Sequence, residues 1–304
     1  MMYDVIIIGS GPAGLSAAIY AQRARLNVLV IEKQPLSGGQ ILNTYDVDNY
    51  PGMPGIGGFE MGMKFREHAD KLGAQIVNET IIQVILEGKT KKVITESQTY
   101  ETKTVVIATG AKHRKLDVPG EKELTGMGVS YCATCDGAFF RGKDTAVIGG
   151  GDVALEDALF LARACNKVYL IHRREEFRGA KILQQKVMEA ENIEVIWDTV
   201  VEQINGDGMV ESISLYNRKK DNRDILAVNG VFVAVGIEPE TDLFMGQVGM
   251  TSGGYIEAGE DCRTDVEGVF AAGDVRTKQL RQVITAAADG ANAITSIEKY
   301  LQML

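Results

Sequence analysis

Residues 4–14 read Asp-Val-Ile-Ile-Ile-Gly-Ser-Gly-Pro-Ala-Gly. The apolar run over 4–8 ends in a glycine, which is typical of a buried parallel strand that runs into a tight turn. Apolar side chains then recur at helical spacing from Pro12 to Arg25, and residues 28–31 form a second apolar run. Strand, glycine loop, helix and strand together predict a βαβ unit that binds a dinucleotide.

The same pattern occurs a second time, where residues 144–154 read Asp-Thr-Ala-Val-Ile-Gly-Gly-Gly-Asp-Val-Ala. A shift of 140 residues aligns the two copies without a gap, so that Gly9 falls on Gly149 and Gly11 on Gly151. Two copies predict an α/β protein with two Rossmann-like dinucleotide-binding domains.

Two polar stretches, 112–120 and 238–242, each contain one proline and predict crossings between domains. They divide the chain into 1–111, 115–240 and 244–304. Because the middle segment holds the second glycine pattern, we expect it to be a domain inserted into the first, which the last segment completes. The final helix is expected over about 284–300.

Composition excludes several classes of protein. The net charge of −9 argues against nucleic-acid binding, and no apolar run reaches the roughly 18 residues of a membrane span. The N-terminus enters a strand almost at once, so no signal peptide is expected and cytoplasmic residence is the default. Four cysteines, only two of them closely spaced, do not make a disulfide-rich secreted scaffold.

The first glycine loop has the features of a dinucleotide site. Gly9 permits the tight turn, and Gly11 lets the backbone approach a pyrophosphate at the positive helix N-terminus. Glu32 ends the second strand, where a carboxylate can bind ribose hydroxyls. The alternative is a glycine-rich turn without a ligand. The candidate residues are Gly9, Ser10, Gly11, Pro12, Ala13, Gly14 and Glu32.

The second copy differs at the end of its second strand, where His172 replaces the carboxylate and Arg173 and Arg174 follow. Cationic groups attract a 2′-phosphate, and arginine can bind it bidentately, so this site is expected to prefer NADPH to NADH. A solvated basic strand end is the alternative. The candidate residues are Gly149, Gly151, Asp152, Ala154, His172, Arg173, Arg174 and Arg178.

A Cys-Ala-Thr-Cys motif, Cys132 to Cys135, lies just ahead of the second copy. This spacing allows a short-loop disulfide and a lowered thiol pKa, and it predicts redox function. Zinc normally needs a second pair or histidines at ligand spacing, but Cys165 and Cys262 are isolated, so no metal site is expected. Asp136 is a candidate proton carrier for the thiols, with a turn or capping role as the alternative.

The chain resembles the bacterial low-molecular-weight NADPH-dependent thioredoxin reductases across essentially its whole length. The Cys-Ala-Thr-Cys-Asp-Gly block at 132–137, just ahead of a second glycine loop, is the most specific of the shared motifs. The others are 9–14, Gly-Gly-Gln at 38–40, Asp-Asn-Tyr-Pro-Gly at 48–52, Ala-Thr-Gly-Ala at 108–111, 149–152, 172–174, Arg178 and Gly-Asp-Val at 273–275.

The resemblance implies FAD in the first domain and NADPH in the inserted one. It places Asp274 on the ribityl chain of the flavin. The further flavin contacts that it implies are Gly39, Gln40, Asn49, Arg281 and Gln282. It also implies a homodimer whose middle domain swings relative to the flavin domain.

The expected function is a thioredoxin-disulfide reductase, in which electrons pass from NADPH to FAD, to the Cys132–Cys135 disulfide and to thioredoxin or a thioredoxin-like protein. The alternatives are a reductase of another redoxin, such as a glutaredoxin-like or peroxiredoxin system, and a ferredoxin/flavodoxin–NADP reductase. The cysteine pair counts against the last of these. Val153 departs from many members of the resembling family, which carry Ser or Thr there, and this puts the affinity for NADPH in question.

Overall fold

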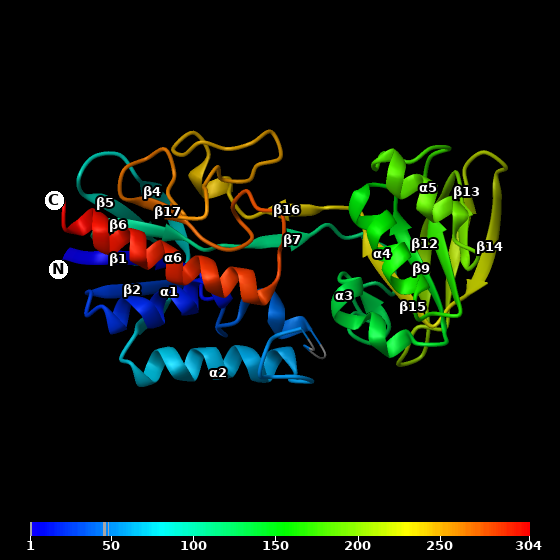
Figure 1. Ribbon diagram of the computed structural model, residues 1–304, viewed down its shortest axis with the longest axis horizontal. Coiled ribbons are helices and arrows are strands. Elements are labelled where there is room, and N and C mark those ends of the chain that lie inside the picture. The colour runs from blue at the N-terminus through cyan, green and yellow to red at the C-terminus, as the bar shows by residue number, and fades with distance from the viewer. Residues whose placement is uncertain (1, 45–46, 48) are drawn as a thin grey trace. The chain divides into compact units, whose positions relative to one another are not determined.

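The computed structural model describes residues 2–44, 47 and 49–304. The chain forms two compact units. The first comprises Met1–Asn43, Tyr50–Lys112 and Glu238–Leu304, and the second comprises Thr44–Asn49 and His113–Ile237. Each unit carries its own sheet with helices packed against it, and the colours in Figure 1 show which parts of the chain form each unit. The predicted fold class, α/β with two Rossmann-like domains, is confirmed.

The first unit is built on a seven-stranded sheet whose middle is parallel and whose edge is antiparallel. Its strands are β1 (Met2–Ile8), β2 (Val28–Glu32), β3 (Gln75–Asn78), β4 (Ile81–Ile85), β5 (Lys91–Thr95), β6 (Thr99–Ile107) and β17 (Val269–Ala271). β1 pairs in parallel with β2 and β6. Both faces of β1 are covered, because Val5 and Ile7 belong to one apolar cluster and Ile6 and Ile8 to another. This explains why the strand is a continuous apolar run rather than an alternating one.

Helices cover one face of this sheet. They are α1 (Pro12–Arg23), α2 (Gly58–Lys71) and α6 (Val283–Leu301), and short 3₁₀ turns occur at η1 (Gly39–Asn43) and η3 (Asp242–Phe244). α1 ends two residues before its predicted end, because Arg25 adopts the left-handed conformation (φ 59°) that commonly follows a helix. α6 spans one residue more at each end than the predicted 284–300.

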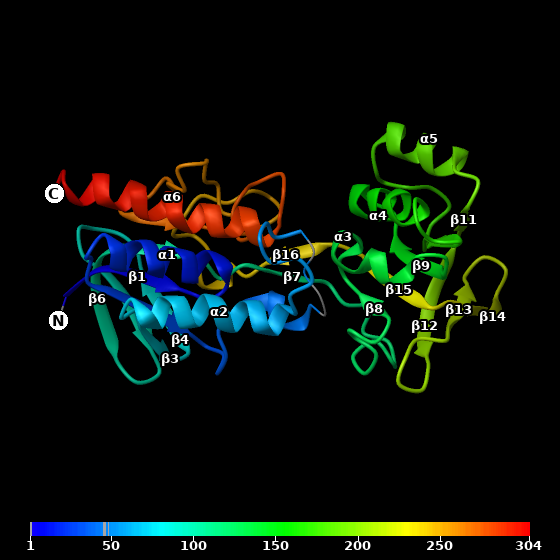
Figure 2. The ribbon, with the colours of Figure 1, turned by 60° about the horizontal axis from the view of Figure 1, so that its bottom comes forward.

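α1 and α6 pack at very short range through small residues, and Figures 1 and 2 both show them side by side. The Ser16 hydroxyl donates to the Ala287 carbonyl at 2.6 Å. A Cβ atom placed on Gly290 would lie 2.2 Å from the carbonyl oxygen of Ala13 and 2.7 Å from the amide nitrogen of Ala17. The helix that opens at the first glycine loop is therefore held against α6 by backbone contact.

The second unit repeats the arrangement with a five-stranded parallel sheet in the order β11-β10-β9-β15-β8. These strands are β8 (Val129–Ser130), β9 (Asp144–Gly149), β10 (Lys167–Ile171), β11 (Ile193–Ile196) and β15 (Gly230–Ala234). The helices are α3 (Ala133–Asp136), η2 (Gly137–Phe140), α4 (Asp152–Ala162) and α5 (Lys181–Glu189). A separate antiparallel sheet contains β12 (Thr199–Asn205), β13 (Ser212–Asn217) and β14 (Asn222–Ala227). β7 (Ala111–His113) pairs with β16 (Ile237–Pro239) where the chain passes between the units.

The repeat is preserved in strand register as well as in sequence. Val5 pairs with Val28 in the first unit, and Thr145 pairs with Val168 in the second. Both members of the second pair lie 140 positions after their counterparts, so the shift seen in the sequence carries over to the sheets.

Replacing Gly290 with Ala is expected to destabilise the first unit by about 1–3 kcal/mol, because the new methyl group must push α6 away from the backbone of α1. The better helix propensity of Ala offsets at most about 1 kcal/mol of this. Chemical denaturation followed by circular dichroism measures the change. Thr295→Ala, on the exposed face of the same helix, is the control and is expected to be near neutral. Equal denaturation midpoints for the two variants would contradict the packing argument.

Candidate functional site

The first glycine loop is shaped by contacts that exclude side chains. Gly9 follows β1 with φ 101°, and a Cβ atom there would lie 2.5 Å from the carbonyl oxygen of Ala108. A Cβ atom on Gly14 would lie 1.9 Å from the carbonyl oxygen of Gly9. Gly11 is the N-cap of α1, and a Cβ atom there would meet only the Cα atom of Gly39, at 4.0 Å. The start of α1 is therefore open to a ligand, as a pyrophosphate requires.

Two further loops of the same unit meet the first one. The Gly38 amide donates to the Ser10 carbonyl at 2.9 Å, which places η1 with Gln40 beside the glycine loop. A Cβ atom on Gly273 would lie 2.9 Å from the Cβ atom of Ala13, so the turn that precedes Asp274 reaches α1. Residues 9–14, 39–40 and 273–274, which are far apart in the chain, are thus brought together.

Glu32 is buried at the end of β2, and its carboxylate is held in one orientation. Its Oε2 atom accepts hydrogen bonds from the backbone amide of Ser10 at 2.8 Å and from the Ser10 hydroxyl at 2.9 Å. Its Oε1 atom accepts from the Gln34 amide at 2.9 Å. A carboxylate offers about four acceptor sites, so capacity remains for ribose hydroxyls.

Asp274 and Arg281 carry polar atoms that the described protein residues do not satisfy. Oδ1 of Asp274 and Nε of Arg281 are buried, and neither finds a hydrogen-bond partner within the described part of the chain. Burial raises the pKa of the Asp274 carboxyl above its ordinary value. The Arg281 guanidinium lies over the ring of Tyr255, 4.2 Å from its centroid, directly before the α6 cap residue Gln282. Buried unsatisfied groups are rare, and here they fit a ligand rich in hydroxyl and carbonyl groups.

A buried charge network fixes the loop that carries Asp274. Asp289 of α6 accepts hydrogen bonds from Arg276 at 2.6 and 2.8 Å, from Lys278 at 2.9 Å and from the Gly273 amide at 2.9 Å. Burial alone would raise the pKa of Asp289, but these hydrogen bonds hold it below its ordinary value. The sequence analysis missed this network. The sequence feature that could have indicated the network is Asp289, a single aspartate among the small apolar residues of the last helix.

The second glycine loop reproduces the first. Gly151 is the N-cap of α4, and a Cβ atom there would meet nothing within 4 Å. The Asp152 carboxylate accepts from the Ala180 amide at 2.6 Å, and the Arg178 amide donates to the Gly150 carbonyl at 2.8 Å. The helix start is therefore open, and the segment around 178–180 is tied to it.

The three predicted arginines line one pocket of about 590 Å³. Arg173, Arg174 and Arg178 are all exposed, so their guanidinium groups are available to a phosphate. Acidic groups border the same pocket, but Glu175 forms an ion pair with Lys219 at 3.1 Å. The remaining lining residues are Glu176, Phe177 and Asp198.

His172 does not join the three arginines in lining the pocket. The imidazole is buried, and a Cβ atom on Gly150 would lie 2.3 Å from it. Burial lowers the pKa of His172 below its ordinary value, and the charges of the adjacent arginines lower it further. The ring also packs against Phe177 and Trp197, whose own rings lie 4.3 Å apart. His172 therefore supports the wall of the pocket as a neutral ring.

Cys132 and Cys135 form a disulfide that spans the single turn of α3. Both residues are partly exposed, so a second thiol or disulfide has access to them. The Ser130 hydroxyl donates to Oδ2 of Asp136 at 2.6 Å and accepts from the Cys132 amide at 3.1 Å. Asp136 is thus held beside the disulfide that it follows in sequence.

The remaining cysteines are inert by comparison. Cys165 and Cys262 are free and buried, and burial raises the pKa of both thiols, that of Cys262 to about 12. Among the described residues, no group of three metal-ligating side chains comes together. Nor does any helix in the described segments have the length and hydrophobicity to cross a membrane.

One flavin-site candidate, Asn49, does not belong to the same unit as the others. Asn49 is exposed and belongs by its contacts to the second unit, whereas the other flavin-site candidates belong to the first. Asp48, which precedes it in the shared motif, lies outside the described residues.

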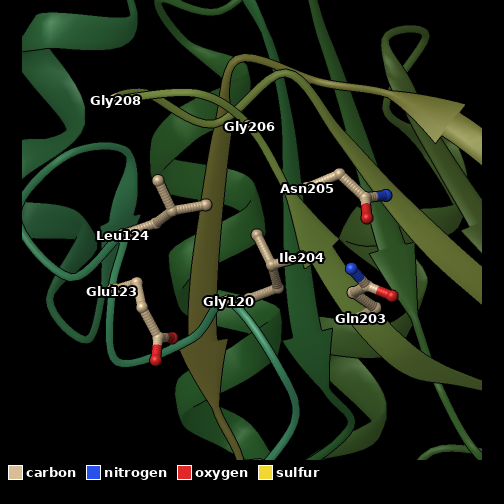
Figure 3. Close-up of a pocket in the computed structure, with 8 residues that line it drawn as sticks. All are labelled: Gly120, Glu123, Leu124, Gln203, Ile204, Asn205, Gly206 and Gly208. Carbon is tan, nitrogen blue, oxygen red and sulfur yellow. The ribbon is translucent and has the colours of Figure 1, made fainter.

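A second pocket, of about 420 Å³, lies in the second unit and contains none of the predicted site residues. Figure 3 shows the side chain of Ile204 between the Glu123 and Leu124 side chains on one side and the amides of Gln203 and Asn205 on the other. One acid and two amides supply no phosphate-binding cation, so this pocket is poorly suited to a nucleotide.

Comparisons with known proteins agree with this geometry. Residues 3–290 match the pyridine nucleotide-disulphide oxidoreductase family. The thioredoxin reductase of Peptoclostridium acidaminophilum is 45% identical over 308 residues, covering 99% of this chain and 98% of the relative. That of Listeria innocua is 46% identical over 306 residues, covering 100% and 95%. The crystal structure of thioredoxin reductase from Streptococcus pyogenes MGAS5005 superposes with a TM-score of 0.94 at 45% identity, covering 100% of this chain and 99% of that one.

Replacing Asp289 with Asn is expected to destabilise the protein by about 3–5 kcal/mol, because Arg276 and Lys278 would be left buried without a counter-charge. In the wild type, a carboxyl with a lowered folded-state pKa contributes stability above its unfolded value of about 3.9 and loses it as the pH falls through the folded value. The variant is expected to lack this loss as the pH falls below about 4. Denaturation midpoints measured across that range check both effects.

The control is Glu298→Gln on the exposed part of the same helix, which is expected to leave the midpoint at pH 7 nearly unchanged. If both variants have the midpoint of the wild type, the network contributes no stability.

Proposed function

The chain belongs to the pyridine nucleotide-disulphide oxidoreductase family, and on this premise we propose that it is a thioredoxin-disulfide reductase. It transfers electrons from a nicotinamide nucleotide through a flavin to the disulfide of thioredoxin. The observation that carries the proposal is the Cys132–Cys135 disulfide, which lies in the same unit as an arginine-lined nucleotide loop while a second dinucleotide loop lies in the other unit. Relatives covering the whole chain bear the name thioredoxin reductase.

We propose that the flavin is FAD and that it binds in the first unit. When bound, the flavin would supply the two-electron redox chemistry that links the nicotinamide to the disulfide. The open start of α1 would receive the pyrophosphate, and Glu32 would bind ribose hydroxyls. Asp274 and Arg281 would hydrogen-bond the ligand through their unsatisfied buried atoms. The remaining proposed contacts are Gly9, Ser10, Gly11, Pro12, Ala13, Gly14, Gly39, Gln40, Asn49 and Gln282.

We propose that the nicotinamide cofactor is NADPH and that it binds in the second unit. The loop at Gly149, Gly151, Asp152 and Ala154 would receive its pyrophosphate at the start of α4. Arg173, Arg174 and Arg178 would bind the 2′-phosphate, and the neutral ring of His172 would support them from below. Val153 is exposed beside this helix start and contributes no hydroxyl group.

The chemistry of the dithiol follows from three residues. Two electrons break the Cys132–Cys135 bond, and Asp136 protonates one of the departing sulfurs. The other sulfur remains a thiolate, which attacks the thioredoxin disulfide, and a second exchange restores the Cys132–Cys135 bond. Because the cysteines and the arginine pocket belong to one unit and the flavin site to the other, we propose that the units rotate between half-reactions so that each donor reaches the flavin in turn.

We also propose that the protein acts as a homodimer in the cytoplasm. The resemblance to the low-molecular-weight reductases supports the dimer, and the free thiols of Cys165 and Cys262 suit a reducing compartment.

Replacing Cys132 or Cys135 with Ser is expected to abolish thioredoxin reduction, because transfer to the partner disulfide requires both sulfurs. Reduction of the bound flavin by NADPH, followed anaerobically as bleaching of its visible absorption, is expected to persist. The released cofactor should be FAD, at about one per chain.

Cys165→Ala, at a buried free thiol of the same unit, is the matched control and is expected to retain turnover. Full turnover by either Ser variant would refute the proposal. If the protein reduced a glutaredoxin-like protein but no thioredoxin, the proposed partner would be wrong and the proposed disulfide-reductase chemistry would stand.

Replacing Arg173 and Arg174 together with Ala is expected to raise the KM for NADPH by at least about tenfold. A charged hydrogen bond to phosphate contributes roughly 1.5–3 kcal/mol when well formed, and these contacts are exposed and partly shared. The KM for NADH is expected to change little, since NADH has no 2′-phosphate. Steady-state kinetics with both cofactors provides the comparison.

Arg163→Ala is the control, because Arg163 is an exposed arginine of the same unit that does not line the pocket. Equal use of NADH and NADPH by the wild type would show that the arginines do not select the cofactor.

A further inference from the structure

Ser130 connects the two halves of the disulfide motif through one oxygen atom. Its Oγ lies 2.6 Å from Oδ2 of Asp136 and 3.1 Å from the backbone nitrogen of Cys132. A hydroxyl has one proton, and a carboxyl oxygen accepts it both in the ionised form and when the acid carries its own proton on the other oxygen. The proton therefore goes to Asp136 rather than to the more distant Cys132 carbonyl, which lies 3.3 Å away, and the Cys132 amide donates to the free lone pair.

The hydroxyl belongs to the parallel sheet of the unit. Ser130 is buried at the end of β8, the edge strand of the five-stranded sheet, and it pairs in parallel with Phe232 of β15. The cysteines, in contrast, belong to a helix of only four residues, Ala133–Asp136: Cys135 lies within it, and Cys132 is its N-cap and makes no side-chain cap hydrogen bond. The placement of the Asp136 carboxylate relative to the disulfide thus depends on an oxygen atom that belongs to the sheet.

We propose that Ser130 is a positioning residue for the thiol–disulfide reaction. This inference rests on the proposed function and on the proton-transfer role of Asp136 within it. When two electrons supplied by the flavin break the Cys132–Cys135 bond, one sulfur takes its proton from Asp136. The Ser130 hydroxyl then donates to the carboxylate that remains, and the other sulfur stays a thiolate. In the return reaction the carboxylate takes the proton back, so the same hydrogen bond holds it within reach of the sulfur in both directions.

A pair of variants with the same shape isolates the hydroxyl. Ser130→Thr keeps the hydroxyl and Ser130→Val replaces it with a methyl group, and both β-branched side chains suit a strand. The Val variant is expected to lose about tenfold in kcat for thioredoxin reduction, the effect of one hydrogen bond to a charged group. Its KM for thioredoxin and its rate of flavin bleaching by NADPH are expected to be unchanged, and the Thr variant is expected to retain most of its kcat. Equal kcat values for the Thr and Val variants would overturn the proposal.

A double-mutant cycle separates positioning from simple packing. If Ser130 acts through Asp136, then Ser130→Val combined with Asp136→Asn is expected to be as slow as Asp136→Asn alone. Multiplied losses in the double variant would show that Ser130 acts independently of the carboxylate and would overturn the proposal.

The proposed function can fail separately from this inference. A wild-type protein that reduces neither thioredoxin nor a small aromatic disulfide with NADPH would refute the reductase assignment itself. A wild-type protein that reduces both, together with a Val variant that matches it, would refute only the role of Ser130.

Discussion

Both units depend on one constraint. A pyrophosphate must be able to reach the start of a helix without meeting a side chain. In each unit the first strand must end in a glycine, because a Cβ atom there would lie 2.5 Å (Gly9) or 2.4 Å (Gly149) from a carbonyl oxygen at the end of a neighbouring strand. The first turn of the helix must then carry a small residue that touches the glycine turn, which is Gly14 in one copy and Ala154 in the other. The continuous apolar strands follow from this, since helices and loops cover both faces of the sheet.

The structural repeat extends beyond the glycine loops that reveal it in the sequence. The Gly38 amide donates to the Ser10 carbonyl, and the Arg178 amide donates to the Gly150 carbonyl, so the same backbone hydrogen bond recurs with both partners shifted by 140 residues. The scaffold is common to the two sites, and the side chain at this position differs. Where the first unit has a glycine beside its loop, the second has an arginine facing the phosphate pocket. Substitution on one shared backbone thus supports the proposal that the two units bind different cofactors.

The features that the sequence revealed were local or periodic, and those it hid depend on long-range contacts. The βαβ units, the cysteine pair and the arginine cluster could be predicted because spacing along the chain determines them. The Asp289 network could not, because it joins α6 to a preceding loop whose course no periodicity describes. The burial of His172 could not be predicted either, because only the structure shows that its ring packs directly against Gly150. The hydroxyl of Ser130 was overlooked because a strand-end serine carries no sequence signal of its partner.

The chain contains a single tryptophan, so its tryptophan fluorescence reports on one place in the molecule. Trp197 packs on Phe177, a residue of the arginine pocket wall, and lies wholly within the second unit. Intrinsic indole emission therefore originates in that unit alone, whereas far-ultraviolet ellipticity sums over both. Melting curves recorded with the two signals refer to different portions of the polypeptide, and their coincidence or separation reports directly on whether the units unfold as one cooperative body.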